Sequence, residues 1–247
     1  MKTSNKLLLG FVGVLFAGML TCNFILKAEY ERIKNEKIVS KEYRTLSKDS
    51  FKYIKVDGTN QLFTTTDDDS EVLVEYATTY EITSLQDISS FAKIRFIGDT
   101  LLVNFEAIPD SLRTYDNQRL IIRCPSVSFI ELKNVNKGYL SDFKLSDLTI
   151  HLKGTSYLGV LNNRIDKMIL QEYNDSSCEI NMTNGAEFKK DTAKKYINHL
   201  KLTLKDRSSF NADDIPFTTI DPIVDDSANI SLSGASLRPL LKRSVQQ

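Results

Sequence analysis

Residues 130–160 read IELKNVNKGYLSDFKLSDLTIHLKGTSYLGV, and one pattern occurs twice in this stretch at a spacing of 20 residues. Apolar residues and a turn residue recur at matching places in the two copies. The matched pairs are Ile130 with Ile150, Leu132 with Leu152, Asn134 with Gly154, and Leu140 with Val160. One copy is too short to bury its own apolar face, but copies stacked in register would bury it as a continuous core. The stretch therefore predicts a parallel β-solenoid with repeats of about 20 residues.

The same pattern continues toward the C-terminus. Its turn positions, at separations of 20, 20, 32 and 20 residues, are Asn134, Gly154, Asn174, Asp206 and Asp226. Apolar residues stand four and two positions before the turns, with breaks at Pro222 and Glu172. Others follow them, including Leu158, Cys178, Phe210 and Ile230. The longer third interval contains EFKKDTAKKY (187–196), which we expect to be a short helix or loop outside the stack.

Upstream of the repeats, short alternating runs are separated by turn residues. They are FKYIKV from residue 51, then EVLVEY, AKIRFIG, LLVNFE and RLIIRCP. Alternation with a period of two and frequent β-branched or aromatic residues indicate strands joined by turns. The fold class predicted from residue 51 onward is therefore all-β.

A stretch of 20 residues without charge, 7–26, lies near the N-terminus. At about 1.5 Å per residue it matches the ~30 Å hydrocarbon core of a bilayer, which predicts a transmembrane helix. The predicted domains are a cytoplasmic tail (1–6), this helix (7–26), a charged helical stalk (27–50), the β-solenoid (51–236) and a C-terminal tail (237–247). A lipoprotein attached through Cys22 is the alternative, because Met19-Leu20-Thr21-Cys22 loosely resembles a lipobox.

The charges that flank residues 7–26 bear on orientation. Lys2 and Lys6 precede the stretch, whereas six basic residues follow it by Arg44, a count that opposes export. Large domains nevertheless translocate largely regardless of charge, and a short leading tail commonly stays in the cytoplasm. We expect a single-pass inner-membrane protein with its C-terminal domain in the periplasm. A stripe of small residues, Gly13, Ala17 and Thr21, leaves a homo-oligomer open.

Composition excludes some partners. The 32 basic residues balance 32 acidic ones, so no global electrostatic field favours nucleic acid, and no nucleic acid is expected as a partner.

The three cysteines, Cys22, Cys124 and Cys178, cannot all pair within one chain. Cys124 and Cys178 occupy apolar positions of the pattern, which predicts small core residues rather than reactive thiols.

The search for chemistry yields few candidates. Only two histidines occur, His151 and His199, and no phosphate-binding or dinucleotide-binding motif is present, so no cofactor is expected. Asp67, Asp68 and Asp69 are candidate Ca²⁺ ligands, although neighbouring acids in turns are mostly solvated. Asp213-Asp214 and Asp225-Asp226 could serve as an acid/base pair on a polysaccharide. Seven tyrosines could form a carbohydrate-stacking face or cap the edge of the core: Tyr53, Tyr76, Tyr80, Tyr115, Tyr139, Tyr157 and Tyr173.

Three features carry a family resemblance: FKYIKVDG (51–58), LIIRCPSVSFIEL (120–132) and Gly, Asn or Asp at corners about every 20 residues. Over residues 51–234 the chain resembles the head GIN domain adhesin family of Bacteroidetes-type bacteria. The resemblance implies a right-handed parallel β-helix, built from a single chain, behind an export signal or anchor in the cell envelope. It brings no catalytic residues. Asn or Asp stands at four of the five corners, where the family favours glycine.

These observations favour a non-enzymatic, membrane-anchored envelope protein that acts as an adhesin or interaction scaffold for a protein or glycan. Two alternatives stay open. A carbohydrate-active β-helix enzyme would need carboxylates converging at about 5–9.5 Å in one groove. A membrane-anchored stress-sensing subunit would associate through its span and stalk.

Overall fold

The structure is a computed structural model, and it describes residues 19, 21, 23, 24, 26, 27, 43–58, 70–85, 89–106, 118–181 and 197–244. The chain divides into two compact units, residues 1–42 and 43–247. Within the described residues, no helix has both the length and the apolar character needed to cross a membrane. The transmembrane helix predicted over 7–26 therefore lacks support, and most of that segment lies outside the described residues.

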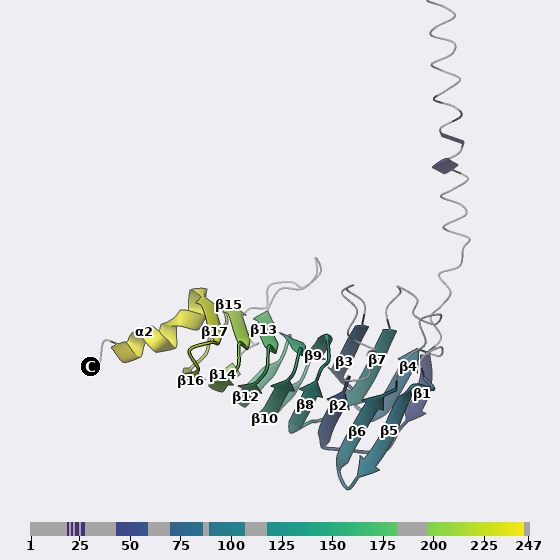
Figure 1. The fold of residues 1–247 in the computed structure, drawn as a ribbon, viewed down its shortest axis with the longest axis horizontal. Coiled ribbons are helices and arrows are strands. Elements are labelled where there is room, and N and C mark those ends of the chain that lie inside the picture. Colours follow the sequence, from purple (N-terminus) through teal and green to yellow (C-terminus); the bar gives the residue numbers. More distant parts are fainter. Residues whose placement is uncertain are drawn as a thin grey trace, which may run out of the picture. The chain divides into compact units, whose positions relative to one another are not determined.

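Two sheets make up the second unit (Figure 1). The nine-stranded sheet contains, in spatial order, β1 (Tyr43–Ser47), β4 (Glu81–Leu85), β7 (Gln118–Cys124), β3 (Ser70–Tyr76), β9 (Lys137–Ser141), β11 (Tyr157–Leu161), β13 (Ser177–Asn181), β15 (Ser209–Asp213) and β17 (Asn229–Ser233). The eight-stranded sheet contains β16 (Thr219–Val224), β14 (Ile197–Leu204), β12 (Arg164–Glu172), β10 (Lys144–Lys153), β8 (Phe129–Lys133), β2 (Tyr53–Asp57), β6 (Thr100–Phe105) and β5 (Ala92–Ile97).

The all-β class is correct, but the predicted single-stranded right-handed parallel β-helix is wrong. Both sheets are mixed, because β1 with β4, β4 with β7, and β5 with β6 pair antiparallel. In the nine-stranded sheet, the spatial order of the first strands also departs from their order in the chain, because β7 lies between β4 and β3. In the eight-stranded sheet the cause is local: a two-residue turn at Gly98-Asp99, with φ of 56° at Gly98, joins β5 to β6, and so short a connection makes neighbouring strands antiparallel.

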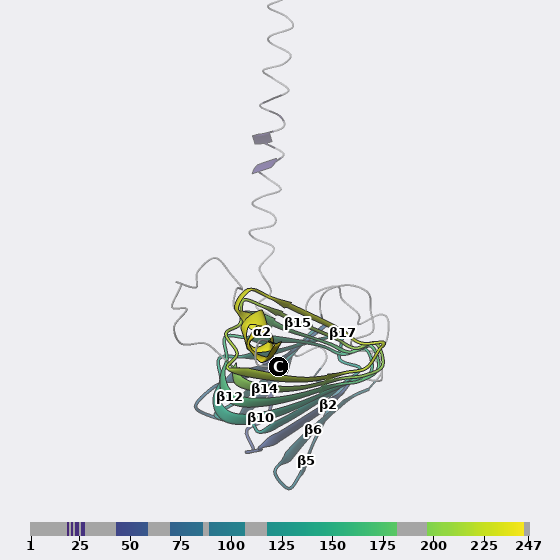
Figure 2. The ribbon, with the colours of Figure 1, turned by 90° about the vertical axis from the view of Figure 1, so that its left-hand side faces the viewer.

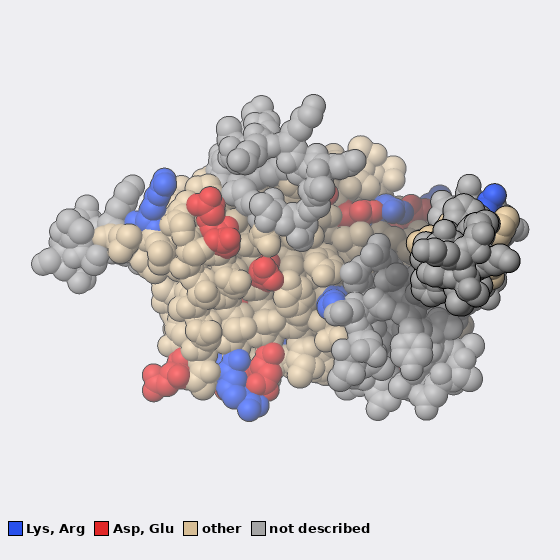
Figure 3. Space-filling model, turned by 90° about the horizontal axis from the view of Figure 1, so that it is seen from above, with Lys and Arg blue, Asp and Glu red and all other residues tan. Residues whose placement is uncertain are grey.

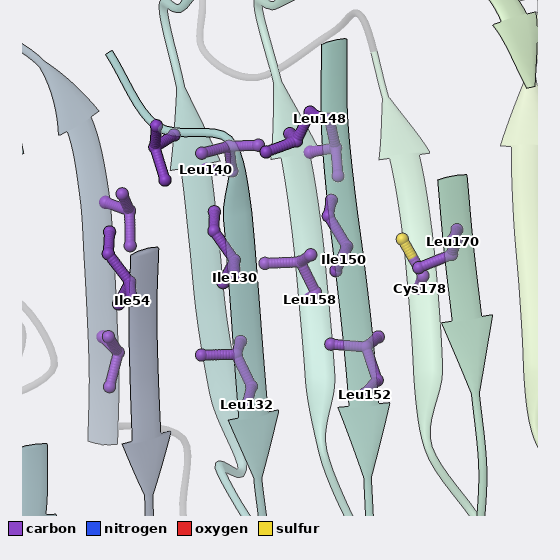
Figure 4. Close-up of a cluster of buried hydrophobic side chains, with 14 of the residues drawn as sticks. Ile54, Ile130, Leu132, Leu140, Leu148, Ile150, Leu152, Leu158, Leu170 and Cys178 are labelled. Atoms are coloured by element: carbon purple, nitrogen blue, oxygen red, sulfur yellow. The ribbon is translucent and has the colours of Figure 1, made fainter. Parts of the chain in front are cut away.

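From β8 onward, the strands alternate between the two sheets and pair in parallel. Ile130 is opposite Ile150, Ile150 is opposite Leu170, and Leu170 is opposite Leu202, which confirms the register predicted from the spacing. These side chains are buried and face those of the other sheet, among them Leu158 and Cys178 (Figure 4). Burying one such side chain stabilises the fold by about 1.5–3 kcal/mol.

The corners of the stack are set by backbone conformation. Asn134, Gly154, Asn174 and Asp206 all have positive φ, between 52° and 64°, as expected of turn residues at the predicted corners. At Gly154, an added Cβ would lie 1.8 Å from Oδ1 of Asn134, so the Asn134 side chain would have to move to admit it. Glycine is favoured there by φ and by the close approach of Asn134.

Both ends of the predicted domain differ from expectation. Tyr43–Ser47 forms β1, so the helical stalk predicted over 27–50 is wrong at these residues. Its alternating polar and aromatic or β-branched residues suit a strand at a sheet edge. At the other end, a 3-10 helix, η3 (Gly234–Leu237), spans the predicted boundary at 236, and the tail predicted over 237–247 contains α2 (Arg238–Ser244). The predicted excursion at 187–196 lies outside the described residues.

We expect Gly154→Ala to destabilise the domain more than Gly98→Ala does. Both glycines have positive φ, but an added Cβ at Gly98 meets nothing within 4 Å. Gly98→Ala should therefore cost only the left-handed backbone strain, about 1–2 kcal/mol. Gly154→Ala adds the clash with Asn134 and should cost about 3 kcal/mol or more. Urea unfolding measures both, and equal losses would show that the Gly154 corner relaxes freely.

Candidate functional site

Aromatic and charged side chains gather on the outer face of the eight-stranded sheet. Three adjacent strands carry them, β2, β8 and β10, whose alternate residues Ile54, Ile130 and Ile150 point into the core. The residues between these point outward because successive side chains of a strand face opposite sides. We name this group of outward-facing residues the outer ladder. Its members are Tyr53, Lys55, Phe129, Glu131, His151 and Lys153.

Phe129 is the centre of the aromatic part of the outer ladder. The Tyr53 ring lies edge-on to it at a centroid distance of 6.5 Å, and the His151 ring lies edge-on at 4.9 Å. Nζ of Lys55 is 5.7 Å from the Phe129 centroid, within range of a cation–π interaction. The Phe129 ring on β8 thus contacts residues of both neighbouring strands, β2 and β10.

Glu131 is the centre of the charged part. Its carboxylate accepts a hydrogen bond from Nζ of Lys153 at 2.6 Å and lies 3.9 Å from Nζ of Lys55. Nδ1 of His151 is also 3.9 Å away. Partial burial lowers the pKa of His151, Lys153 lowers it further, and Glu131 opposes them, so the imidazole is neutral at pH 7. Exposed ion pairs of this kind contribute little stability, about 0–1 kcal/mol each.

The outer face of the nine-stranded sheet has a different character. Seen from above, the visible surface is mostly tan but carries separate acidic and basic groups (Figure 3), and on the nine-stranded sheet Arg123 lies 2.6 Å from Glu75 and 3.4 Å from Glu81. Tyr139 and Tyr157 lie edge to face at 6.2 Å, and the Tyr157 hydroxyl donates to Glu179 at 3.0 Å. An added Cβ at Gly159 would lie 2.7 Å from the Tyr139 ring, so this ring packs directly on the Gly159 backbone. An aromatic ring that covers a glycine in a sheet has a structural role.

The predicted acidic sites are not brought together. Asp213 ends β15 of the nine-stranded sheet and Asp214 follows it, whereas Asp225-Asp226 follows β16 of the eight-stranded sheet. Oδ1 of Asp214 accepts the Ala235 amide at 2.9 Å, and the Asp213 carboxylate accepts from the Ser233 hydroxyl of the paired strand β17, so both have structural roles. The part of the chain that the structure describes has no group of three His, Cys, Asp or Glu residues able to hold a metal. Asp67, Asp68 and Asp69 lie outside it.

The candidate tyrosines are also dispersed. Tyr53 belongs to the outer ladder, and Tyr139 and Tyr157 lie on the opposite sheet. Tyr76 packs against Phe143 and Tyr80 against Phe51, as aromatic residues at the edge of a core do. Tyr173 donates to Gln171 at 3.3 Å, and Tyr115 lies outside the described residues. A continuous tyrosine face is therefore absent from the described strands.

The remaining predicted residues lie as follows. Cys124 and Cys178 are buried free thiols, which confirms that they are core residues, and burial raises the pKa of Cys124 to about 12. Nδ1 of His199 lies 2.8 Å from the Thr219 hydroxyl on a neighbouring strand. Cys22 lies outside the described residues.

Glu172 is a buried carboxyl group that sequence reasoning noted only as a break in the apolar pattern. It lies between Leu152 and Leu204 in the stack and is fully buried. Neither of its carboxyl oxygens has a hydrogen-bond partner among the described residues. Desolvation raises its pKa to about 9, so it is protonated at neutral pH. Because the Glu172 side chain is fully buried, its carboxyl group cannot contact a substrate.

Glu172 should make the stability of the domain depend on pH. An acid whose pKa is higher in the folded chain binds a proton on folding, so stability is full below the unfolded pKa of about 4.3 and falls as pH rises toward about 9. The slope is about 1.4 kcal/mol per pH unit, or about 4 kcal/mol between pH 5 and pH 8.

Urea unfolding of Glu172→Gln at these two pH values checks this expectation, because the amide cannot ionise. The variant should lose most of the slope and be the more stable protein at pH 8. Glu106→Gln is the control, since it removes a carboxylate that stays exposed beside Lys93. If Glu172→Gln keeps the wild-type slope, the Glu172 carboxyl is solvated or paired in solution.

Comparison with known proteins gives a distant structural likeness. No protein-family model matches the chain, and no curated protein matches its sequence. Among solved structures, a "putative adhesin" from Bacteroides fragilis is 12% identical with a TM-score of 0.45, and the match covers 78% of this chain and 92% of that one. A "putative lipid binding protein" from Parabacteroides distasonis is 8% identical with a TM-score of 0.40, covering 78% and 96%. A "putative cell adhesion protein" from Clostridium sporogenes is 9% identical with a TM-score of 0.23, covering 78% and 97%. These values are too low for any role to be transferred from them.

Proposed function

We propose that this chain is a non-enzymatic cell-envelope protein that binds a protein or glycan partner through the outer ladder, as an adhesin or interaction scaffold does. The observation that carries the proposal is the joining of aromatic and charged side chains around Phe129 and Glu131 on one sheet face. Aromatic residues are enriched in the energetically dominant parts of interfaces, and flanking charges fix orientation.

The ladder is suited to recognition because its geometry is fixed before a partner arrives. Its side chains rise from paired strands, and their ring and ion-pair contacts restrict their rotamers. A pre-ordered surface loses less conformational entropy on binding than a flexible loop. Phe129 and Tyr53 offer ring surface to a sugar or an apolar side chain, while Lys55 and Lys153 can pair with acidic groups.

The chemistry of the described residues favours binding over catalysis. The acids proposed for polysaccharide cleavage belong to turns after strands of different sheets, and Glu172 is sealed in the core. The envelope location rests on the family resemblance of residues 51–234. Attachment by a helix over 7–26 forms no part of the proposal. The stress-sensing alternative stays a prediction, since Cys22 lies outside the described residues.

Phe129→Ala and Glu131→Ala test the role of the outer ladder. The purified chain is applied to arrays of bacterial and host glycans and envelope proteins, and the strongest ligand is then titrated. Truncation of a central interface residue typically costs 2 kcal/mol or more, so Phe129→Ala should weaken binding by about 30-fold.

Two exposed residues away from the ladder provide matched controls: Lys201 on the same sheet and Asn211 on the other sheet. Lys201→Ala and Asn211→Ala should bind as the unaltered chain does, with all variants checked for equal stability. Loss of binding in Asn211→Ala but not in Phe129→Ala would assign recognition to the opposite face. Release of reducing sugar from any polysaccharide on the array would contradict the non-enzymatic assignment.

A further inference from the structure

The C-terminal end of the stacked sheets is incompletely covered. β16 and β17 are the last strands of the two sheets, and each pairs with only one other described strand. Figure 2 looks toward this end and shows α2 in front of part of it. Leu240 of α2 packs against the core. The short helices η3 and α2 therefore cover part of the last layer of the stack.

Residues at core positions become exposed at this end. Leu132, Leu152 and Leu204 are buried, but Val224, at the next place in the same column, is 38% exposed. In the nine-stranded sheet, Phe210 is buried whereas Ile230, opposite it, is only partly buried. A further layer on this end would bury both positions.

Exposed aliphatic side chains are concentrated here. Among the described residues of the range 43–244, five large aliphatic residues are exposed, and four of them belong to β16, η3 or α2. These four are Ile223 (56%), Val224 (38%), Leu237 (38%) and Leu241 (60%), and the fifth is Ile97 (66%) in the distant β5–β6 hairpin. Ile223 and Val224 point to opposite sides of the edge strand β16, because successive side chains of a strand alternate, so they flank its free edge. Exposed apolar residues gathered at one end of a domain mark an interaction surface.

The free edge of β16 is poorly suited to pairing with a further strand. The Asp225 amide donates to the Leu204 carbonyl of β14, and alternate residues of a strand direct their N–H groups to opposite sides. Pro222 therefore occupies a place whose N–H would face the free edge, and proline has none to offer. A partner is expected to pack onto the side chains of this end rather than extend the eight-stranded sheet.

Charges of both signs lie at the same end. Asp225 and Asp226 form the turn after β16, and α2 begins with Arg238 and contains two further basic residues and no acidic one. In a two-fold arrangement, the acidic turn of one copy can face the basic helix of the other, twice over. A surface that carries both halves of a complementary pair is suited to a second copy of itself.

We propose that two copies of this chain associate end to end through β16, η3 and α2. Leu237 and Leu241 of each copy cover Ile223 and Val224 of the other, and Arg238 faces the Asp225-Asp226 turn across the interface. The association completes the open end of the core, and it is independent of the partner bound by the outer ladder.

Cysteine crosslinking of the full chain, purified in mild detergent, tests the arrangement. On a Cys22→Ser background the two remaining thiols, Cys124 and Cys178, are buried. Leu241→Cys and Ile223→Cys place a thiol at the proposed interface, and Ile97→Cys places one of similar exposure elsewhere. A short bis-maleimide should yield a dimer with the first two and not with the third.

Reversing the charges of Arg238 and of Asp225-Asp226 distinguishes a specific interface from non-specific apolar association. Arg238→Asp, added to Leu241→Cys, should raise the dissociation constant of the dimer about tenfold by breaking two symmetric pairs. Further substitution with Asp225→Arg and Asp226→Arg should restore crosslinking. The proposal is overturned by equal crosslinking at Ile97, by no dimer at either interface position, or by indifference to Arg238→Asp. Binding of this end to anionic lipid vesicles without any dimer would also overturn it, because α2 would then contact a membrane surface instead.

Discussion

Parallel register is the constraint on which the C-terminal half of this protein depends. A residue such as Ile150 is buried only because Ile130 and Leu170 lie directly beside it on neighbouring strands, at the ~4.8 Å spacing of a sheet. A shift of one residue would expose every inward side chain of the strand. Positive φ at the corners fixes the length of each layer, and the contact between Asn134 and the bare Cα of Gly154 shows how closely successive corners approach.

The same register that builds the core also builds the outer ladder. Because Ile130 pairs with both Ile54 and Ile150, the residues beside them are held in rows on the outer face. Phe129 thereby reaches Tyr53 on one side and His151 on the other without any dedicated loop. Both outer faces carry paired charges, Arg123 with Glu75 and Glu81 on the nine-stranded sheet and Lys153 with Glu131 on the eight-stranded sheet. The faces differ in their aromatic residues, because Gly159 lets Tyr139 lie against the backbone, whereas the Phe129 ring lies beside the charged group, with Lys55 over it.

Sequence spacing predicts pairing where repeats stack directly, as from Ile130 to Leu202, and it predicts which residues form the corners. It fails before Phe129, because the connections there are of unequal length and the hairpin at Gly98 reverses the chain. The break at Glu172 is visible in the sequence, but full burial without a partner depends on the neighbouring layers. In the sequence, two adjacent acidic residues such as Asp213-Asp214 are compatible with either a binding site or a turn. The hydrogen bond from the Ala235 amide to Asp214 identifies the turn. The outer ladder has no sequence motif, since it is assembled from residues up to 100 positions apart.

The ends of a stack present a problem that its middle does not. At the N-terminal end, the antiparallel strands β1, β4 and β5 stop the parallel pairing and change the pattern that a further strand would meet. At the C-terminal end the chain uses Pro222 and a seven-residue helix, which block strand addition at β16 but leave aliphatic side chains exposed. The first device ends the parallel pairing, whereas the second removes one N–H group from the free edge of β16. An edge strand such as β16 that disfavours another strand yet retains exposed apolar side chains is selective, because it opposes growth of the eight-stranded sheet while it still favours a partner of matching shape and charge.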